Sequence, residues 1–176
     1  HSPLTESYLI IVDYDIDTDS LYLAHDDDRF LGDENIIYLI GEAAPQWHAT
    51  QTRGIDNNGN LDSLRGKWVL IEFWGLSCAP CLKRKIPKLI RFYEEHAELR
   101  DKFEIVGVCI GYEGKPATLA ELDQDLLPII ENVWQGQKIP FPIVLDTTFT
   151  TWERFGISGL GASVLVDPDG ILVEGD

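Results

Sequence analysis

The residues of this chain best suited to catalysis by type and spacing are two cysteines separated by two residues, Cys78 and Cys81. They follow residues 68–74, an apolar stretch with the composition of a buried strand. A cysteine in the first turn of a following helix meets unpaired backbone N–H groups and the positive end of the helix dipole, which stabilise a thiolate. The strand followed by the C-x-x-C pair therefore predicts a redox dithiol.

The two thiols are expected to divide the work between them. Cys78 is placed as the attacking thiolate. Cys81, one helical turn further along, is better shielded and within reach of the first sulfur, so it can attack a mixed disulfide and release the substrate. Pro80 suits this geometry, because proline is favoured in the first helical turn and has no N–H that needs a partner.

Two other uses of a C-x-x-C pair stay open at this point. Half of a zinc site would need further Cys or His ligands at suitable spacing, and the chain offers only Cys109 and four scattered histidines. A structural disulfide would close a very short loop and contribute little chain-entropy stabilisation. Cys109 lies in the apolar run 106–110 and is expected to be a buried, inert thiol. Redox use is the favoured interpretation, and no metal site is expected.

Length, composition and charge exclude some classes of protein. The chain has 176 residues, of which 44% are hydrophobic, enough for the core of one domain with an appendage. A net charge of −16 argues against nucleic acid or an anionic membrane as a partner, because both attract clustered Lys and Arg. No run of about 18 apolar residues would span a membrane. The chain starts at His1 and lacks methionine, so a processed or cut form of a longer protein is expected.

Residues 1–44 hold eleven acidic side chains against a single basic one and are expected to form an acidic β-rich appendage or the tail of a preceding domain. Strands are expected at residues 8–17, 21–24 and 36–40. The aspartates from Asp13 onward resemble the start of a calcium loop. However, Thr18 stands at the position of the required glycine and Ala24 at that of the closing glutamate. A solvated strand face is the favoured interpretation.

Residues 45–176 alternate strand and helix patterns, which predicts an α/β sheet with helices on both faces. Strands are expected at residues 68–74, 103–110, 143–145, 162–166 and 171–173. Helices are expected at residues 79–100, 118–134 and 148–155, the second opened by a capping box of Thr118 and Glu121. Turn residues predict hairpins around 57–60 and 168–170.

Several motifs occur in order along this part of the chain: GEAAP at 41–45, LRGKWVL at 64–70 leading into FW at 73–74, CAPC at 78–81, PFPIVLD at 140–146, FGISG at 155–159 and LVDPDG at 165–170. Together they resemble the thioredoxin fold, and within it the extracytoplasmic thiol:disulfide reductases of the TlpA/ResA type with their redoxin, AhpC/TSA-like relatives. The resemblance covers about residues 40–176 and implies a thioredoxin-like sheet flanked by helices on both faces. The family's last helix has no counterpart after the final hairpin, which favours a multidomain parent.

The resemblance implies a proton acceptor at Glu72, six residues before Cys78. A carboxyl group held in an apolar strand has a raised pKa and can accept the proton of Cys81 as that thiol attacks. Alternatively, Glu72 points to solvent or pairs with a lysine, since strand alternation alone does not decide the face. The resemblance also implies substrate contacts, and the candidates are Trp74, which is expected in the core beside the site, Ala79, Pro80, Leu160 and Gly161.

Three positions depart from the family pattern. Gly161 stands where the family has a cis-proline that docks the substrate backbone, and a non-proline cis bond costs about 2.5–4 kcal/mol, so a trans and looser loop is expected. Ser77 replaces an aromatic residue before the first cysteine, which shifts partner preference. Pro87 comes six residues after Cys81 in place of the usual five, so the helix is expected to bulge or bend differently.

Residues 83–85 are all basic and could lower the pKa of Cys78 or receive an acidic partner, but a solvated face is favoured.

The favoured function is a thiol:disulfide oxidoreductase that reduces protein disulfides outside the cytoplasm, either periplasmic or tethered to a membrane. The Cys78–Cys81 disulfide would be its redox centre, with no other cofactor, and a membrane-bound thiol donor would supply electrons. The alternative is a non-catalytic binding or assembly module of a larger extracytoplasmic protein, since fold does not settle function. A peroxiredoxin would need T-x-x-C, and Gly75 stands in place of that threonine. A copper or zinc carrier would need a histidine near the dithiol, which no sequence neighbour supplies.

Overall fold

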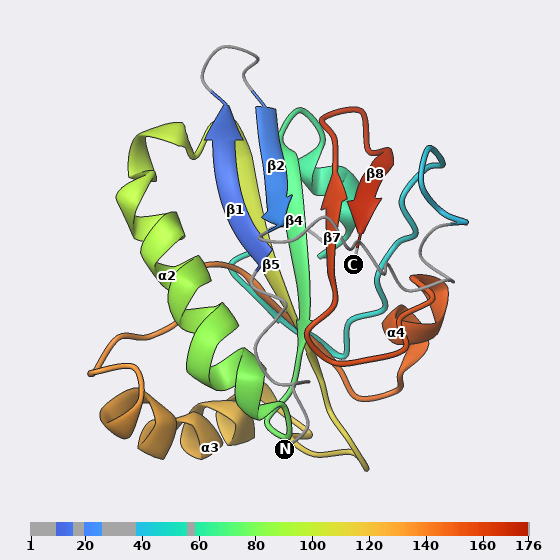
Figure 1. The fold of residues 1–176 in the computed structure, drawn as a ribbon. Coiled ribbons are helices and arrows are strands. Elements are labelled where there is room, and N and C mark those ends of the chain that lie inside the picture. Colours follow the sequence, from blue (N-terminus) through green and yellow to red (C-terminus); the bar gives the residue numbers. More distant parts are fainter. Residues whose placement is uncertain (1–9, 16–19, 26–37, 56–58, 176) are drawn as a thin grey trace, which may run out of the picture.

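The computed structural model describes residues 10–15, 20–25, 38–55 and 59–175, and these form two separate sheets (Figure 1). The first is an antiparallel pair of β1 (Ile10–Asp15) and β2 (Ser20–His25). The second has six strands in the order β3-β6-β5-β4-β7-β8. Its strands are β3 (Gln51–Arg53), β4 (Trp68–Trp74), β5 (Phe103–Ile110), β6 (Ile143–Asp146), β7 (Ser163–Val166) and β8 (Leu172–Gly175).

Strands β4, β5 and β6 run parallel at the centre of the large sheet, and β3, β7 and β8 are antiparallel to their neighbours. Strand β4 is apolar almost throughout because both faces of the sheet are covered. Its Leu70 and Trp74 side chains join one hydrophobic core, and Ile71 and Phe73 join the other. By the same alternation, Glu72 lies on the face of Leu70 and Trp74.

Helices cover both faces of the large sheet, as expected. One face packs against η2 (Cys81–Lys85), α2 (Ile86–Glu95) and α3 (Leu119–Asn132). The helices α2 and α3 lie on the left in Figure 1. The other face packs against η1 (Leu61–Leu64) and α4 (Thr150–Arg154). A further 3-10 turn, η3 (Ala97–Leu99), follows α2. No helix in the described ranges combines the length and apolar character needed to cross a membrane.

Most of the expected elements occur with bounds close to those predicted, but two local expectations are wrong. Turn residues at 57–60 predicted a hairpin, yet β3 pairs with the distant β6, and the 3-10 turn η1 follows residue 60. Residues 56–58 of that turn lie outside the described ranges. The strand expected at 36–40 is also wrong in its described part, because residues 38–41 form a turn.

Hydrogen bonds tie the end of this turn to the large sheet. Gly41 donates its N–H to the Leu172 carbonyl at 2.8 Å, and the Leu172 N–H donates to the Glu42 carbonyl at 2.9 Å. The part of the chain that joins the large sheet therefore begins by residue 41. That residues 1–44 form an appendage of their own stays a prediction.

Candidate active site

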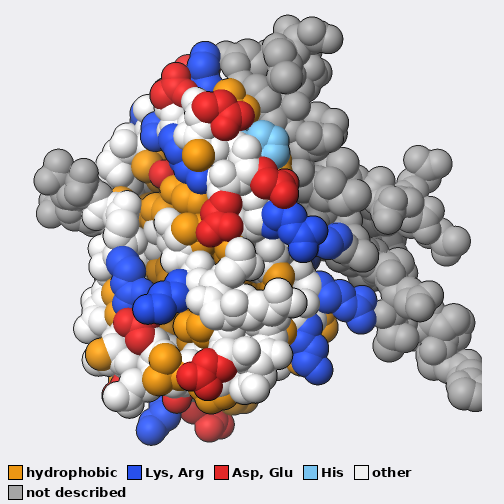
Figure 2. All heavy atoms as spheres, turned by 90° about the vertical axis from the view of Figure 1, so that its left-hand side faces the viewer, with side chains coloured by type: hydrophobic (Ala, Val, Ile, Leu, Met, Phe, Trp, Pro, Cys, Tyr) orange, Lys and Arg blue, Asp and Glu red, His pale blue; other side chains and the backbone are white. Residues whose placement is uncertain are grey.

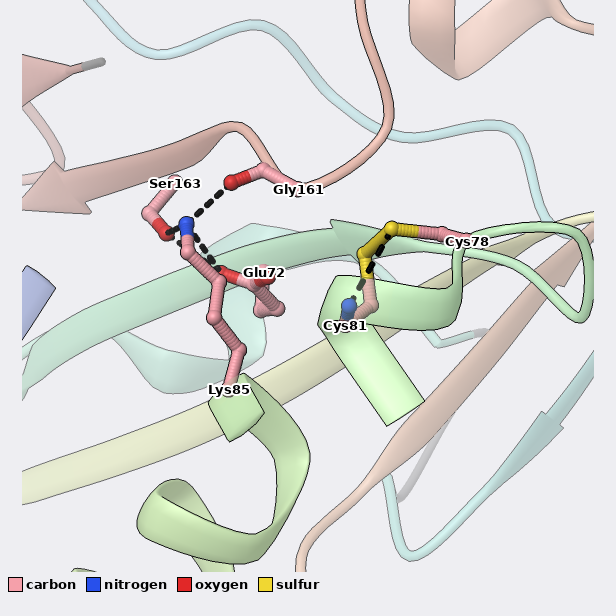
Figure 3. Close-up of a disulfide and its surroundings, with 6 residues drawn as sticks. All are labelled: Glu72, Cys78, Cys81, Lys85, Gly161 and Ser163. Carbon is pink, nitrogen blue, oxygen red and sulfur yellow. Dashed lines mark hydrogen bonds and ion pairs between the residues drawn. A yellow bond between two sulfur atoms is a disulfide. The ribbon is translucent and has the colours of Figure 1, made fainter. Parts of the chain in front are cut away.

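The C-x-x-C pair lies at the carboxyl end of β4, where the strand turns into the η2–α2 helix. The Cys78 N–H donates to the Gly75 carbonyl at 3.0 Å, which closes this turn. The two cysteines form a disulfide with their Cα atoms 5.3 Å apart (Figure 3). Cys81 is completely buried and Cys78 is half-buried. The expected division between an accessible first sulfur and a shielded second sulfur is therefore confirmed.

Local backbone groups around Cys78 favour a thiolate in the reduced protein. The Cys81 N–H donates to the Cys78 Sγ at 3.3 Å, and helical residues begin at Ala79. An N–H aimed at the sulfur, together with the positive end of the helix dipole, stabilises negative charge there. Ser77, Ala79 and Pro80 are exposed around this sulfur, so an incoming disulfide can reach it.

The helix after the dithiol begins with a turn of π-helix, η2, before it becomes the α-helix α2. A π-turn accommodates one residue more than an α-helical turn. Pro87 stands in the first turn of α2, where proline is tolerated, so the extra residue between Cys81 and Pro87 is absorbed in η2. The expected bulge is confirmed, and it changes the direction of the side chains that η2 carries.

Glu72 is buried on the side of the sheet that η2 covers, with 1% of its surface exposed. Its Oε2 accepts a hydrogen bond from the Ser163 hydroxyl of β7 and lies 3.7 Å from the Lys85 Nζ (Figure 3). Burial and pairing with a lysine were alternatives from the sequence alone, and both occur. Solvent exposure of Glu72, the other alternative, is excluded.

The three basic residues of η2 do not share one environment. Lys83 and Arg84 are exposed, as expected for a solvated face. Figure 2, which views the side of α2 and α3, shows basic side chains at this surface with acidic and hydrophobic ones between them. Lys85 differs, because its side chain is only 14% exposed and points under the loop that contains Gly161 (Figure 3). A solvated position for Lys85 is therefore wrong.

Gly161 lies directly against the dithiol. Its φ is +95°, and a Cβ atom added there would stand 3.4 Å from the Cys81 Sγ. The peptide bond before it is trans, since Lys115–Pro116 is the cis bond found in the described ranges. The Gly161 N–H donates to the Phe73 carbonyl at 2.6 Å, and its carbonyl accepts from Lys85. The trans geometry is as expected, but the expected looseness is not seen at Gly161, which is bonded through both backbone groups.

Two further candidates for substrate contact lie beside the dithiol loop. Leu160 is half-buried, and one of its methyl groups would stand 3.2 Å from a Cβ atom at Gly75. Trp74 has no exposed surface, so its assignment to the substrate surface is corrected to a core position. Gly107 makes room for it, because a Cβ atom there would approach the indole Nε1 to 2.9 Å.

The remaining cysteine is buried, as expected. Burial raises the pKa of the Cys109 thiol to about 12, which keeps it protonated. Among the described residues, no three His, Cys, Asp or Glu side chains are grouped so that they could hold a metal ion. Two of the aspartates considered for calcium, Asp17 and Asp19, lie outside the described ranges.

Comparison with known proteins decides the family. The model of the AhpC/TSA family matches residues 40–174. The chain belongs to the AhpC/TSA family. Among similar proteins, the thiol-disulfide oxidoreductase ResA of Bacillus subtilis (strain 168) is 30% identical over 145 residues, which are 82% of this chain and 70% of that protein.

Solved structures agree on the fold of this AhpC/TSA-family chain. The thioredoxin domain of a thiol-disulfide oxidoreductase from Bacteroides vulgatus is similar with a TM-score of 0.54 and 24% identity, over 78% of this chain and 87% of that one. A thiol-disulfide isomerase from Corynebacterium glutamicum has a TM-score of 0.55 and 18% identity, over 76% and 85%. The fold is thioredoxin-like, and with its dithiol and its ResA relative this AhpC/TSA-family chain is a thiol-disulfide oxidoreductase.

Two residues of the site were missed from the sequence. Ser163 lies directly opposite Glu72 in the β4–β7 pair, and a polar residue in an otherwise apolar strand was its signal. Lys85 was mentioned only as part of a charged run. The additional residue between Cys81 and Pro87 was the signal for its inward direction. Which side chain that residue turns inward depends on where the π-turn forms.

Proposed function

We propose that this chain reduces disulfides of proteins outside the cytoplasm, with Cys78 as the attacking thiolate, Cys81 as the resolving thiol and Glu72 as the proton acceptor. The main support is the buried Glu72 carboxylate, which lies on the face of the sheet that the Cys81 turn covers. Packing alone does not favour a carboxylate in an apolar core, because burying its charge costs free energy. At this position it supplies a base on the buried side of the dithiol.

The reaction proceeds in two exchanges. The Cys78 thiolate attacks one sulfur of the substrate disulfide, forms a mixed disulfide and releases the other sulfur as a thiolate, which takes up a proton from water. Cys81 then transfers its proton to the Glu72 carboxylate and attacks the Cys78 sulfur. This forms the Cys78–Cys81 disulfide and releases the second substrate sulfur as a thiolate, which also takes up a proton from water. Two electrons pass from the dithiol to the substrate, and the structure has the oxidised product form.

The substrate surface is proposed around the accessible sulfur. Ala79 and Pro80 are exposed beside Cys78, and Leu160 and Gly161 form the neighbouring loop. Substrate backbone would lie along that loop, and Ser77 offers a small polar contact in place of a ring. A membrane-bound thiol donor would return the Cys78–Cys81 disulfide to the dithiol. An extracytoplasmic place of action is proposed from the likeness to ResA alone.

The reduction potential of the dithiol tests the direction of this reaction. The protein is equilibrated in dithiothreitol or glutathione buffers of known poise, free thiols are trapped, and their number is read by mass. A midpoint near or below about −250 mV is expected for a reductant, whereas a value near about −120 mV would indicate an oxidant. The Cys78→Ser variant is the control, since it cannot form the pair. Failure of the wild-type protein to cycle at any poise would favour the non-catalytic module.

A further inference from the structure

Lys85 is the basic side chain that the π-turn directs into the dithiol site. It comes four residues after Cys81, at the end of η2. Its two basic neighbours in the same turn, Lys83 and Arg84, are exposed, whereas its own side chain is 14% exposed. Moving a lysine ammonium group out of water is costly unless polar groups replace the water, so its surroundings call for an explanation.

Three oxygen atoms surround the Lys85 ammonium group (Figure 3). It donates to the Gly161 carbonyl, lies 3.3 Å from the Ser163 hydroxyl and lies 3.7 Å from the Glu72 Oε2. An ammonium group has three N–H donors, so the number of oxygen atoms matches the number of donors. One of these oxygens belongs to the loop against Cys81 and another to the carboxylate that serves as the base.

We propose that Lys85 is a positioning residue of the dithiol reaction, which holds the Glu72 carboxylate ionised and fixes the Gly161 loop against Cys81. This inference rests on the proposed function. A cation within 4 to 6 Å favours the charged form of a carboxyl group, and burial weakens the screening of that interaction by water. An ionised Glu72 is the form that can accept the Cys81 proton.

The other titratable groups on this face of the sheet do not replace Lys85. Cys81 faces the same side from η2, and Cys109 faces it from β5 with a pKa of about 12, so it stays neutral. Glu174 of β8 lies opposite Leu165 and carries the same sign of charge as Glu72. Arg100 also lies on this side, but it sits over the rings of Tyr93 and Phe103, and Phe103 pairs with Trp68 at the far end of β4 from the dithiol. Lys85 is therefore the positive charge beside Glu72.

The test follows the second exchange by itself. The reduced protein is mixed with an aromatic disulfide that releases one coloured thiolate when Cys78 attacks and a second when Cys81 attacks. The rate of the second release is measured against pH. In Lys85→Gln, which keeps a donor but loses the charge, Glu72 takes up its proton at higher pH. The rise of the second-release rate with pH is expected to shift to higher pH by about one unit or more, with the rate of the first release unchanged. This rise is called the limb of the pH profile below.

Matched variants separate charge from structure. Lys85→Arg, which keeps the charge, is expected to restore the wild-type limb, and Lys83→Met on the exposed side of the same turn is expected to leave it in place. Lys85→Met removes charge and donor and is expected to shift the limb as Lys85→Gln does. In a Glu72→Gln background, Lys85→Gln is expected to produce no further shift, because the titrating partner is gone.

Each other outcome is decisive. A folded Lys85→Gln protein with the wild-type limb overturns the proposal, and so does a shift that persists in the Glu72→Gln background. Loss of folding in both Lys85→Gln and Lys85→Met, with Lys83→Met folded, would assign Lys85 to stability alone and also overturn it. If the wild-type protein releases no second thiolate at any pH, the proposed function fails first. Normal release by the wild type with an unaltered Lys85→Gln profile refutes only the role of Lys85.

Discussion

Ser163 and Glu72 lie directly opposite each other on the antiparallel strands β7 and β4, and the Ser163 hydroxyl donates a hydrogen bond to the Glu72 carboxylate. Each of these residues has 1% of its surface exposed. A buried carboxylate needs donors that replace the water it has lost. The register of this strand pair therefore supplies one donor, and the π-turn supplies a second through Lys85.

Replacing Ser163 should lower the free energy of unfolding more than the small size of its side chain suggests. Ser163→Ala removes a donor from a buried carboxylate, and the expected loss in the free energy of unfolding is about 1–3 kcal/mol. Urea denaturation followed by tryptophan fluorescence measures it. Ser77→Ala is the matched control, because Ser77 is exposed and should change stability little. Equal unfolding midpoints for the two variants would show that the hydroxyl does not stabilise Glu72.

Gly161 should tolerate no side chain without cost. Its φ of +95° is rarely adopted by other residues, so Gly161→Ala is expected to lower the free energy of unfolding by about 1 kcal/mol or more. Gly161→Pro should cost more, because it also removes the N–H that donates to the Phe73 carbonyl. Gly159→Ala is the control, since a Cβ atom at Gly159 meets nothing within 4 Å. A Gly161→Ala protein as stable as Gly159→Ala would contradict the strain at Gly161.

Glu104 should make stability depend on pH. Burial raises the pKa of Glu104 above 4.5, partly offset by its hydrogen bond to Tyr93. A raised pKa in the folded state means that stability is fully present below pH 4.5 and is lost as the pH rises through the folded-state pKa. Glu104→Gln is therefore expected to stabilise the protein at pH 7 and to have little effect at pH 4.

Chemical denaturation at both pH values checks this prediction. Glu98→Gln serves as the control, because Glu98 is exposed and should give the same small effect at each pH. If Glu104→Gln shifts the unfolding midpoint equally at pH 4 and pH 7, the half-buried Glu104 carboxyl group is not the source of the pH dependence.

Cys109 should be inert in the native protein. Its thiol is fully buried, and a pKa of about 12 leaves almost no thiolate at pH 8. Brief alkylation of the reduced, folded protein with iodoacetamide is expected to modify Cys78 and to spare Cys109, which reacts only after unfolding. Peptide mass analysis locates the label. Rapid labelling of Cys109 under native conditions would show that the β5 core opens, contrary to its burial.

The sequence was sufficient for the parts of this protein that depend on local patterns. The apolar run of β4, the C-x-x-C pair at its end and the capping residue Thr118 are all local, and each occurs as expected. A bulge or bend after the dithiol was also indicated, because the spacing between Cys81 and Pro87 is a property of the sequence, and it occurs as the π-turn η2.

What could not be predicted depends on pairing between distant segments. Turn residues at 57–60 gave no information about β3, whose partner β6 lies about ninety residues away along the chain. The contact between Ser163 and Glu72 depends on the β4–β7 register, which only the folded sheet defines. The complete burial of Trp74 follows from Gly107 on the neighbouring strand, and no pattern within β4 shows it.

Trapping the mixed disulfide tests the proposed mechanism most directly. Reduced Cys81→Ser and Cys78→Ser proteins are each mixed with a disulfide-containing peptide, quenched with acid and analysed by mass. The half-buried Cys78 and the fully buried Cys81 predict that Cys81→Ser accumulates a peptide adduct on Cys78 and that Cys78→Ser accumulates none. An adduct on Cys81 in the Cys78→Ser protein, or no adduct in either, would contradict attack by Cys78 and resolution by Cys81.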